Sequence, residues 1–148
     1  MVRDSRTYTS NIHEVGTMRE FVREKCSEQW GSDQETDDAI HLLMLAVDEA
    51  ATNIILHAYE RQVDRLIELV IEIDAGHVIV TLFHHGRDFD PATVPPPSYD
   101  GSRQSGFGVW LIEQAVDEVT YRRIESGQCA VRMVKRRPLP QETGGSAR

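Results

Sequence analysis

The sequence predicts an α+β fold, and three patterns support this prediction. Two long segments carry apolar residues at steps of three and four, the spacing of helices that face a core. Two pairs of segments alternate apolar and polar residues around turns that contain glycine, as β-hairpins do. All of these segments lie within 148 residues, a length that fits one domain with a substantial hydrophobic core.

The N-terminal part predicts a strand followed by a helix. Residues 6–12 are rich in Thr and Tyr, which favours a short strand at an edge of the sheet. The helix that follows ends where Gly31, Ser32 and Asp33 interrupt the apolar pattern. Its apolar stripe consists of Val15, Met18, Phe21, Val22, Cys26 and Trp30.

A second helix is predicted over residues 40–59, and it carries the most informative pattern in the chain. Its apolar stripe consists of Ile40, Leu43, Met44, Val47, Ala50, Ala51, Ile54 and Ala58. Beside this stripe, Glu49, Asn53 and His57 follow one another at steps of four, so they share one edge of the helix. A carboxylate, an amide and an imidazole in this arrangement indicate a functional site.

The middle of the chain predicts a hairpin and then a long irregular connection. The strands of the hairpin are expected at 66–73 and 77–83, because both segments alternate in hydropathy around Asp74-Ala75-Gly76. Regularity ends over residues 84–105, where four prolines exclude a helix or a central strand. In a compact domain, a connection of this length is usually a lid or a binding loop.

The C-terminal part predicts a third helix at 107–116 and a second hairpin with strands at 119–124 and 129–135. The domain is therefore expected to span residues 1–136. Residues 137–148 are rich in proline and glycine and predict a disordered tail.

Composition disfavours several classes of function. The formal net charge of −8 disfavours direct binding of nucleic acid or of an anionic membrane. No apolar run approaches the ~20 residues that a membrane span requires, and the N-terminus lacks a signal peptide, so a cytoplasmic location is expected. Cys26 and Cys129 lie far apart without paired spacing, which favours two reduced thiols over a metal site.

Two glycine-containing motifs bracket the irregular segment. The first follows the predicted strand and runs from His84 through Gly86 to Pro91, and the second, Gly106-Phe107-Gly108-Val109, opens the third helix. Small residues at a helix start allow phosphate oxygens to approach backbone N–H groups, where the helix dipole favours negative charge. A Gly-x-Gly motif alone is more often a flexible connection, so the second motif gains weight only together with the others.

Together these motifs resemble the GHKL ATPase domain shared by gyrase, Hsp90, histidine kinases and MutL. The resemblance spans nearly the whole chain and is strongest to a branch of small anti-sigma factors and serine-protein kinases. Residues 49–53 with His57 resemble the N box of that family, Gly86 with 89–91 resembles its first glycine box, and 106–109 resembles its second.

The resemblance implies a specific architecture. It predicts an α+β two-layer sandwich, in which a mixed, mostly antiparallel sheet is covered on one face by helices. It also places ATP between the helix layer and a lid formed by residues 91–105.

The resemblance further implies ATP and Mg²⁺ as cofactors and assigns roles to individual residues. Asn53 would coordinate Mg²⁺ through its amide oxygen, a hard ligand of the kind that this ion prefers. Glu49 would be the catalytic base that accepts the proton of a serine hydroxyl. The residues assigned to cofactor binding are Asn53, His57, His84, Gly86, Arg103, Gly106, Phe107, Gly108 and Val109.

The sequence departs from the family pattern at His84, where the family carries an aspartate that accepts a hydrogen bond from adenine. An imidazole accepts such a bond only when it is neutral and in the correct tautomer. Either another group, such as Asp88, reads the base, or nucleotide binds weakly. Cys129 or Ala130 stands where the family has a threonine. A metal pair of His84 and its neighbour is disfavoured, because adjacent strand residues point to opposite faces.

The function implied by the resemblance is that of a partner-switching regulator. Such a protein binds a sigma factor and phosphorylates a serine of a STAS-domain anti-anti-sigma protein, usually as a homodimer. The alternative is a binding module that keeps the fold and sequesters its partner without phosphoryl transfer. A third interpretation, a detached histidine-kinase catalytic domain, fits less well, because the lid is short and no phosphoacceptor helix is predicted.

Overall fold

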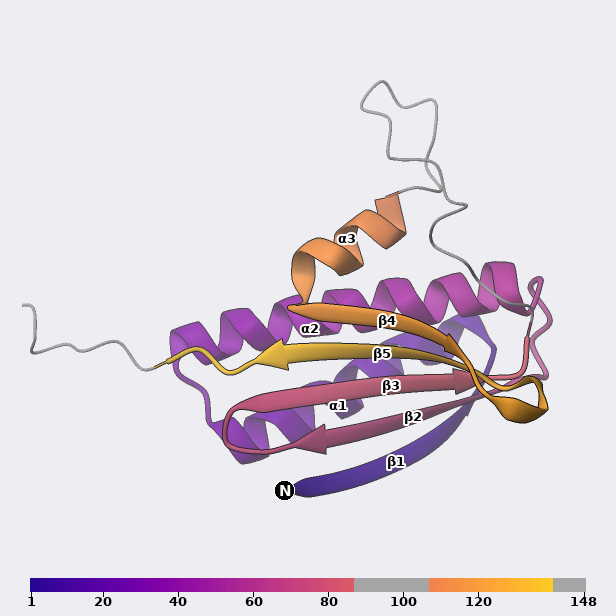
Figure 1. The fold of residues 1–148 in the computed structure, drawn as a ribbon. Coiled ribbons are helices and arrows are strands. Elements are labelled where there is room, and N and C mark those ends of the chain that lie inside the picture. The colour runs from indigo at the N-terminus through magenta and orange to yellow at the C-terminus, as the bar shows by residue number, and fades with distance from the viewer. Residues whose placement is uncertain (87–106, 140–148) are drawn as a thin grey trace, which may run out of the picture.

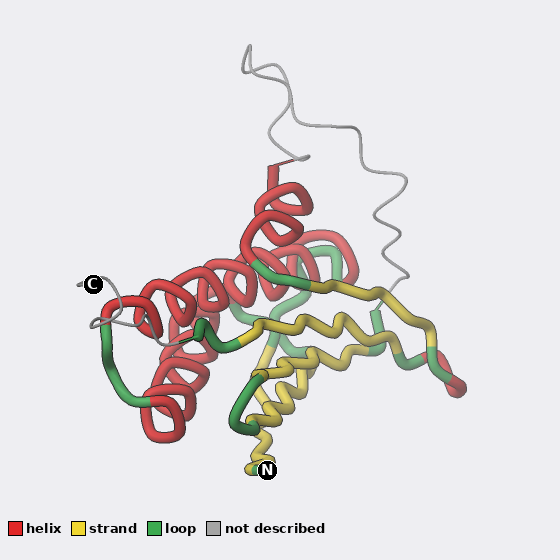
Figure 2. Tube along the Cα trace, turned by 60° about the vertical axis from the view of Figure 1, so that its left-hand side comes forward, coloured by secondary structure: helices red, strands yellow, loops and turns green. Residues whose placement is uncertain are grey.

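The computed structural model of the protein describes residues 1–86 and 107–139. These residues form a five-stranded sheet with helices on one face only (Figure 1). A second view, turned by 60°, shows the same two layers (Figure 2). The strand order is β1-β2-β3-β5-β4, and all four pairings between described strands are antiparallel. The predicted two-layer α+β sandwich is confirmed, with an antiparallel sheet in its described part.

The elements have the following bounds. The strands are β1 (Val2–Thr9), β2 (Leu66–Ile73), β3 (His77–His84), β4 (Glu118–Arg123) and β5 (Cys129–Arg136). The helices are α1 (Val15–Trp30), α2 (Gln34–Asn53) and α3 (Phe107–Ala115). Shorter helical turns are η1 (Ile12–Glu14), η2 (Ile54–Ala58) and η4 (Glu125–Gly127).

Two elements begin earlier than the sequence pattern predicted. β1 starts at Val2 rather than at residue 6, because its backbone pairs with β2 along the full length of that strand. It lies at an edge of the sheet, as predicted. α2 starts at Gln34, six residues before Ile40, because the Asp33 carboxylate accepts a hydrogen bond from the Thr36 N–H at 2.9 Å and caps the helix.

Strand alternation decides which side chains reach the core between sheet and helices. On β3, Val80 and Leu82 are fully buried, whereas Ile79 and Phe83 are half-buried on the uncovered face. Because side chains alternate along a strand, His84 shares the buried face with Leu82. The sheet therefore delivers His84 to the helix side of the molecule.

The central helix has the length and composition that a membrane span would need. Residues 34–58 form 25 continuous helical residues with a mean hydropathy of 1.5 in their most apolar window. Half of that window is buried inside the protein. Its apolar character is therefore that of a core helix.

The end of this helix changes its geometry immediately after Asn53. The turn η2 is a π-helix, and the Tyr59 N–H donates to the Ile54 carbonyl oxygen at 2.8 Å across five residues. Glu60 and Arg61 then adopt left-handed backbone conformations, with φ of 50° and 67°. A π turn is wider than an α turn, so residues after Asn53 do not continue the straight edge of α2.

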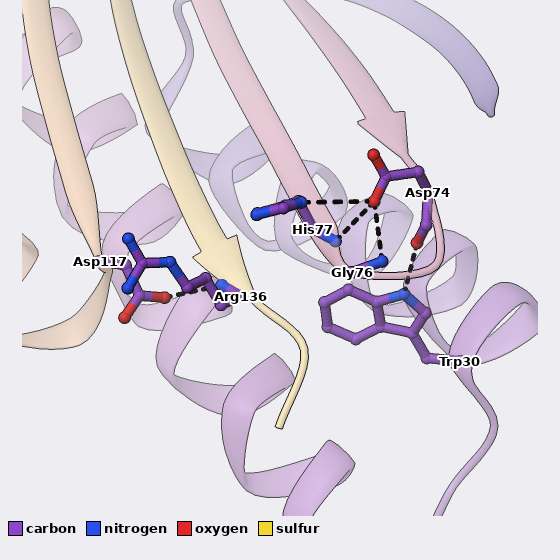
Figure 3. A network of polar contacts seen from close by, with 6 residues as sticks. All are labelled: Trp30, Asp74, Gly76, His77, Asp117 and Arg136. Atoms are coloured by element: carbon purple, nitrogen blue, oxygen red, sulfur yellow. Dashed lines mark hydrogen bonds and ion pairs between the residues drawn. The ribbon is translucent and has the colours of Figure 1, made fainter. Parts of the chain in front are cut away.

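The β2–β3 turn is fixed to the end of α1 (Figure 3). The Trp30 indole N–H donates to the Asp74 carbonyl oxygen at 2.9 Å. The Asp74 carboxylate accepts hydrogen bonds from the backbone N–H groups of Gly76 at 2.8 Å and His77 at 2.7 Å. These bonds join the sheet and the helix layer at the end of β3 that lies farthest from His84.

The C-terminal end of β5 is bonded to the same region, near the β2–β3 turn and the end of α1. The Arg136 N–H donates to the Asp117 carboxylate at 2.6 Å (Figure 3). The Arg137 N–H donates to the Gly76 carbonyl oxygen, and the Arg137 guanidinium donates to the carbonyl oxygen of Trp30. Arg137, which the sequence assigned to the tail, is thus bonded to the domain, while residues 140–148 lie outside the described part.

Candidate functional site

The first turn of α3 lies directly against the polar edge of α2. A Cβ atom placed on Gly108 would come 3.0 Å from Glu49 Oε2 and 3.3 Å from Asn53 Oδ1. This approach leaves no free space for a side chain, which explains the glycine. The structure thus brings together Glu49 and Asn53 from the first predicted motif and Gly108 from the second.

Glu49 is half-buried at this contact. Desolvation raises the pKa of its carboxyl group above the ordinary value, and the neighbouring charge of Asp48 raises it further. Asp48 forms an ion pair with Arg19 at 3.4 Å, whereas Glu49 has no ion pair with any described residue. A carboxylate whose pKa is raised, and which has no ion-pair partner among the described residues, has the properties of a general base.

Asn53 presents an unsatisfied group in the same corner. Its side-chain nitrogen Nδ2 is buried and has no hydrogen-bond partner within residues 1–86 and 107–139. An unpaired buried amide costs free energy, so Asn53 Nδ2 is a candidate donor to a bound ligand. The Asn53 oxygen lies on the same side, toward Gly108.

His57 is separated from these two residues by the π turn. It is exposed and lines an open cavity of about 330 Å³ together with Leu56, Glu60 and Arg61. The straight alignment of His57 with Glu49 and Asn53 was expected from α-helical spacing, but residues 54–58 have π-helical spacing instead.

Gly86 lies against the end of the same helix. A Cβ atom placed there would come 2.6 Å from the Ala58 carbonyl oxygen and 2.9 Å from Tyr59 Cδ1. Both distances are shorter than real side-chain contacts, so the chain that leaves β3 needs glycine to pass the helix end. Gly86 of the first glycine motif is therefore in contact with the helical turn that follows Asn53.

His84 lies buried beside Gly86 and Tyr59. It is 2 % exposed, its ring meets the Tyr59 ring edge-on at 5.9 Å, and its Nδ1 accepts a long hydrogen bond from the Gly86 N–H at 3.4 Å. Its backbone pairs directly with Cys129, while Ala130 pairs with Phe83. The register therefore places Cys129, rather than Ala130, beside His84.

The two adjacent histidines differ in exposure, because His84, the last residue of β3, is buried and His85, the residue after it, is exposed. Within the described residues, no group of three His, Cys, Asp or Glu side chains could hold a metal ion.

The remaining predicted residues fall into two groups. Phe107 is half-buried beside Gly108, and Val109 is 7 % exposed on the inner side of α3, while the next residue, Trp110, is 37 % exposed. Arg103, Gly106, Asp88, residues 89–91 and the predicted lid at 91–105 lie outside the described residues.

One residue at this site was missed in the sequence. Tyr59 is 6 % exposed and contacts both the segment that contains Gly86 and the first residue of β2, Leu66. The sequence did offer a signal, since Tyr59 is an aromatic residue with a polar tip that directly follows the His57-Ala58 end of the helix.

The donors in this corner fit a nucleotide with Mg²⁺ better than a metal ion held by protein alone. Asn53 offers one amide oxygen, and Mg²⁺ commonly takes one or two protein ligands while phosphates and water complete its shell. Glu49 places a carboxylate one helical turn away, and the backbone at the start of α3 lies close to both side chains, where N–H groups favour an anion.

These features define a class of protein: an ATPase fold in which one helix of a two-layer sandwich carries a carboxylate and an amide against a glycine motif. Residues 8–135 match the family described as the histidine kinase-like ATPase domain, and the chain belongs to this family. Membership of this family implies the use of ATP.

The similar proteins include a bacterial anti-sigma factor and a bacterial serine-protein kinase. The chain is 31% identical over 105 residues to the anti-sigma F factor of Clostridium botulinum (strain Alaska E43 / Type E3), which covers 68% of this chain and 73% of that protein. It is 34% identical over 101 residues to the serine-protein kinase RsbW of Staphylococcus aureus (strain bovine RF122 / ET3-1), covering 62% of this chain and 63% of that protein.

Solved structures support the fold. The RsbU and RsbW domains of a Mycobacterium tuberculosis protein superpose with a TM-score of 0.65 at 19% identity, over 97% of this chain and 34% of that one. The mycobacterial sensor histidine kinase MprB superposes with a TM-score of 0.51 at 16% identity, over 93% of this chain and 100% of that one.

Proposed function

We propose that this protein is an anti-sigma regulatory factor with ATP-dependent serine-protein kinase activity. Its targets are a sigma factor and a STAS-domain anti-anti-sigma protein, and it acts in the cytoplasm as a homodimer. Similarity to an anti-sigma F factor and to serine-protein kinases supports the regulatory role. The observation that carries the kinase activity is the contact of Glu49 and Asn53 with Gly108.

The proposed chemistry is transfer of the γ-phosphoryl group of ATP to a serine hydroxyl. Glu49 accepts the hydroxyl proton while the serine oxygen bonds to phosphorus and ADP leaves. Backbone N–H groups at the start of α3, next to Gly108, stabilise the charge on the phosphate oxygens.

Asn53 binds the cation through its amide oxygen. When bound, Mg²⁺ neutralises charge on the phosphates as it develops. The position of the Asn53 oxygen next to Gly108 supports this role, and the buried, unpaired Nδ2 could donate to a phosphate oxygen of the same ligand. His84, Gly86, Phe107 and Val109 are proposed to line the rest of the nucleotide site.

The experiment that tests this function combines binding and transfer. Calorimetric titration with ATP, ADP and GTP, each with Mg²⁺, measures nucleotide binding by the wild-type chain. Transfer of labelled γ-phosphate to a STAS-domain protein from the same organism, with the Ser→Ala form of that protein as control, measures the kinase activity. Binding of ATP with transfer to serine is expected.

A second candidate function is a binding module that sequesters a sigma factor without phosphoryl transfer. The observation that favours it is the buried His84, an imidazole in place of the carboxylate that the resemblance leads one to expect. In this case the chain captures a sigma factor with an affinity that ATP and Mg²⁺ leave unchanged, and no label reaches the STAS-domain protein.

A further inference from the structure

Tyr59 stands where three segments of the site meet. Its hydroxyl group donates to the carbonyl oxygen of Leu66, the first residue of β2, at 2.5 Å. The same oxygen accepts from the N–H of His85, the residue after β3, at 2.9 Å. Burial raises the pKa of Tyr59, so the hydroxyl stays protonated and keeps its role as donor at physiological pH.

The ring of Tyr59 also contacts the end of β3 and the residues after it, and the backbone of Tyr59 is bonded to the turn after Asn53. Its ring edge meets His84, with ring centroids 5.9 Å apart and an interplanar angle of 81°. Its Cδ1 would lie 2.9 Å from a Cβ atom on Gly86. Its N–H is bonded to Ile54, the residue directly after Asn53. One side chain thus contacts three consecutive residues, 84–86, and belongs to the helical turn that follows Asn53.

We infer that Tyr59 is a positioning residue for nucleotide binding. It fixes the segment His84–Gly86 relative to Asn53, so that the two motifs contributing to the site keep one geometry before ligand arrives. The inference rests on the proposed function, because it assigns Tyr59 to the same nucleotide site. In this role Tyr59 does not need to touch the nucleotide.

Removal of the Tyr59 hydroxyl group alone tests this positioning role. Tyr59→Phe keeps the ring that packs on Gly86 and His84, and it removes both hydrogen bonds to the ends of β2 and β3. Without them, the segment after β3 must be ordered by the ligand, which weakens binding. Glu49 keeps its place, so the transfer step itself is unchanged.

Tyr8 provides a matched control. It is also 6 % exposed, and its hydroxyl lies near the Arg6 guanidinium but makes no hydrogen bond of normal geometry with a described residue. Tyr8→Phe therefore removes one buried hydroxyl group without removing a bridge between segments. Any effect of a Tyr→Phe change at a buried position as such appears in both variants, whereas loss of positioning is specific to Tyr59→Phe.

The experiment measures steady-state transfer from ATP with Mg²⁺, together with hydrogen exchange of the His85 amide. For Tyr59→Phe we expect a KM for ATP about tenfold above wild type, a kcat within about twofold of wild type, and faster exchange at His85. Tyr8→Phe should leave KM within about twofold of wild type.

An unchanged KM in Tyr59→Phe, or an equal rise in KM in Tyr8→Phe, would overturn the inference and leave the proposed function standing. Failure of the wild-type chain to bind ATP would overturn the proposed function instead. In that case the exchange rate at His85 alone decides whether Tyr59 fixes this segment, and an unchanged rate in Tyr59→Phe would reject the inference as well.

Discussion

Gly108 and Glu49, which are 59 positions apart in the sequence, touch in the folded protein: a methyl group on Gly108 would come 3.0 Å from the carboxylate oxygen Oε2. The start of α3 and the polar edge of α2 therefore form one surface. Since the same hypothetical methyl group would lie 3.3 Å from Asn53 Oδ1, this surface contains both proposed functional groups.

The first prediction concerns this contact. Gly108→Ala should displace Glu49 and Asn53 and lower kcat/KM for phosphoryl transfer by about tenfold or more, since small displacements of catalytic groups are costly. Gly16→Ala is the matched control, because the nearest group to a Cβ there is the flexible tip of Arg19 at 3.6 Å. Steady-state kinetics of both variants should show the loss in Gly108→Ala alone.

The second prediction separates the two polar residues of α2. Glu49→Gln should abolish phosphoryl transfer and leave ATP affinity within about threefold of wild type, because the isosteric amide cannot accept the proton. Asn53→Ala should weaken both transfer and Mg²⁺-dependent ATP binding, since it removes the proposed cation ligand. Calorimetry with and without Mg²⁺ distinguishes the two effects, and transfer by Glu49→Gln at the wild-type rate would remove Glu49 from the mechanism.

The third prediction is a pH dependence. Glu49 must be ionised to act as a base, and burial followed by the Asp48 charge raises its pKa above the ordinary 4.5, so kcat should fall as pH decreases through this raised value. Asp48→Asn removes the second cause and should shift the acid limb of the pH profile to lower pH. An acid limb that does not move in this variant would exclude Glu49 as the titrating base.

The raised pKa of Glu49 also affects the stability of the fold, with a pH dependence opposite to that of kcat. A carboxyl group whose pKa is raised in the folded state holds its proton more tightly there, so the contribution of Glu49 to stability is fully present below pH 4.5 and is lost as pH rises through the folded pKa. Glu49→Gln should therefore raise the thermal midpoint at neutral pH and not at acidic pH. Thermal unfolding at both pH values tests this independently of activity.

The fourth prediction concerns base recognition. His84→Asp should tighten binding of adenine nucleotides and leave affinity for guanine nucleotides unchanged, because a carboxylate accepts a hydrogen bond from adenine that an imidazole can accept only when neutral and in one tautomer. Parallel titrations with ATP and GTP measure the change. Equal or weaker ATP affinity in this variant would show that another residue recognises the base.

The fifth prediction concerns the close approach at Gly86. Gly86→Ala should destabilise the fold by about 1–3 kcal/mol, because its methyl group would meet the Ala58 carbonyl oxygen at 2.6 Å. Gly76→Ala serves as control, since its nearest neighbour, Asp74 Oδ1, would be 3.8 Å away. Denaturant unfolding measures the midpoints of both variants, and equal midpoints would contradict this expectation.

Much of the fold follows from hydrophobic periodicity, which is strong in this chain. The stripe from Val15 to Trp30 predicted α1 with its observed ends, and the alternation over residues 66–73 predicted β2. The start of β1 could not be predicted, because Val2-Arg3-Asp4 becomes strand only by pairing with residues around Glu72, far along the chain. A contact of this kind leaves no periodic signal in Val2-Arg3-Asp4 itself.

The site was predictable where it depends on helical spacing and not where that spacing changes. Glu49 and Asn53 are one α turn apart, and the structure places them together. The π turn that follows depends on where the chain must go to reach β2, so the position of His57 could not be derived from a count of four. The role of Tyr59 as a link between strand ends likewise depends on tertiary contacts alone.

The two tryptophans of the chain give the protein an intrinsic pair of optical reporters. Trp30 is 4 % exposed and fixed to the β2–β3 turn, while Trp110 is 37 % exposed on the helix that begins at the glycine motif. Indole emission responds to the polarity around the ring, so a Trp30→Phe chain would fluoresce from the neighbourhood of Glu49 and Asn53, and a Trp110→Phe chain from the opposite end. Ligand arrival and global unfolding can thereby be followed separately, without an added dye.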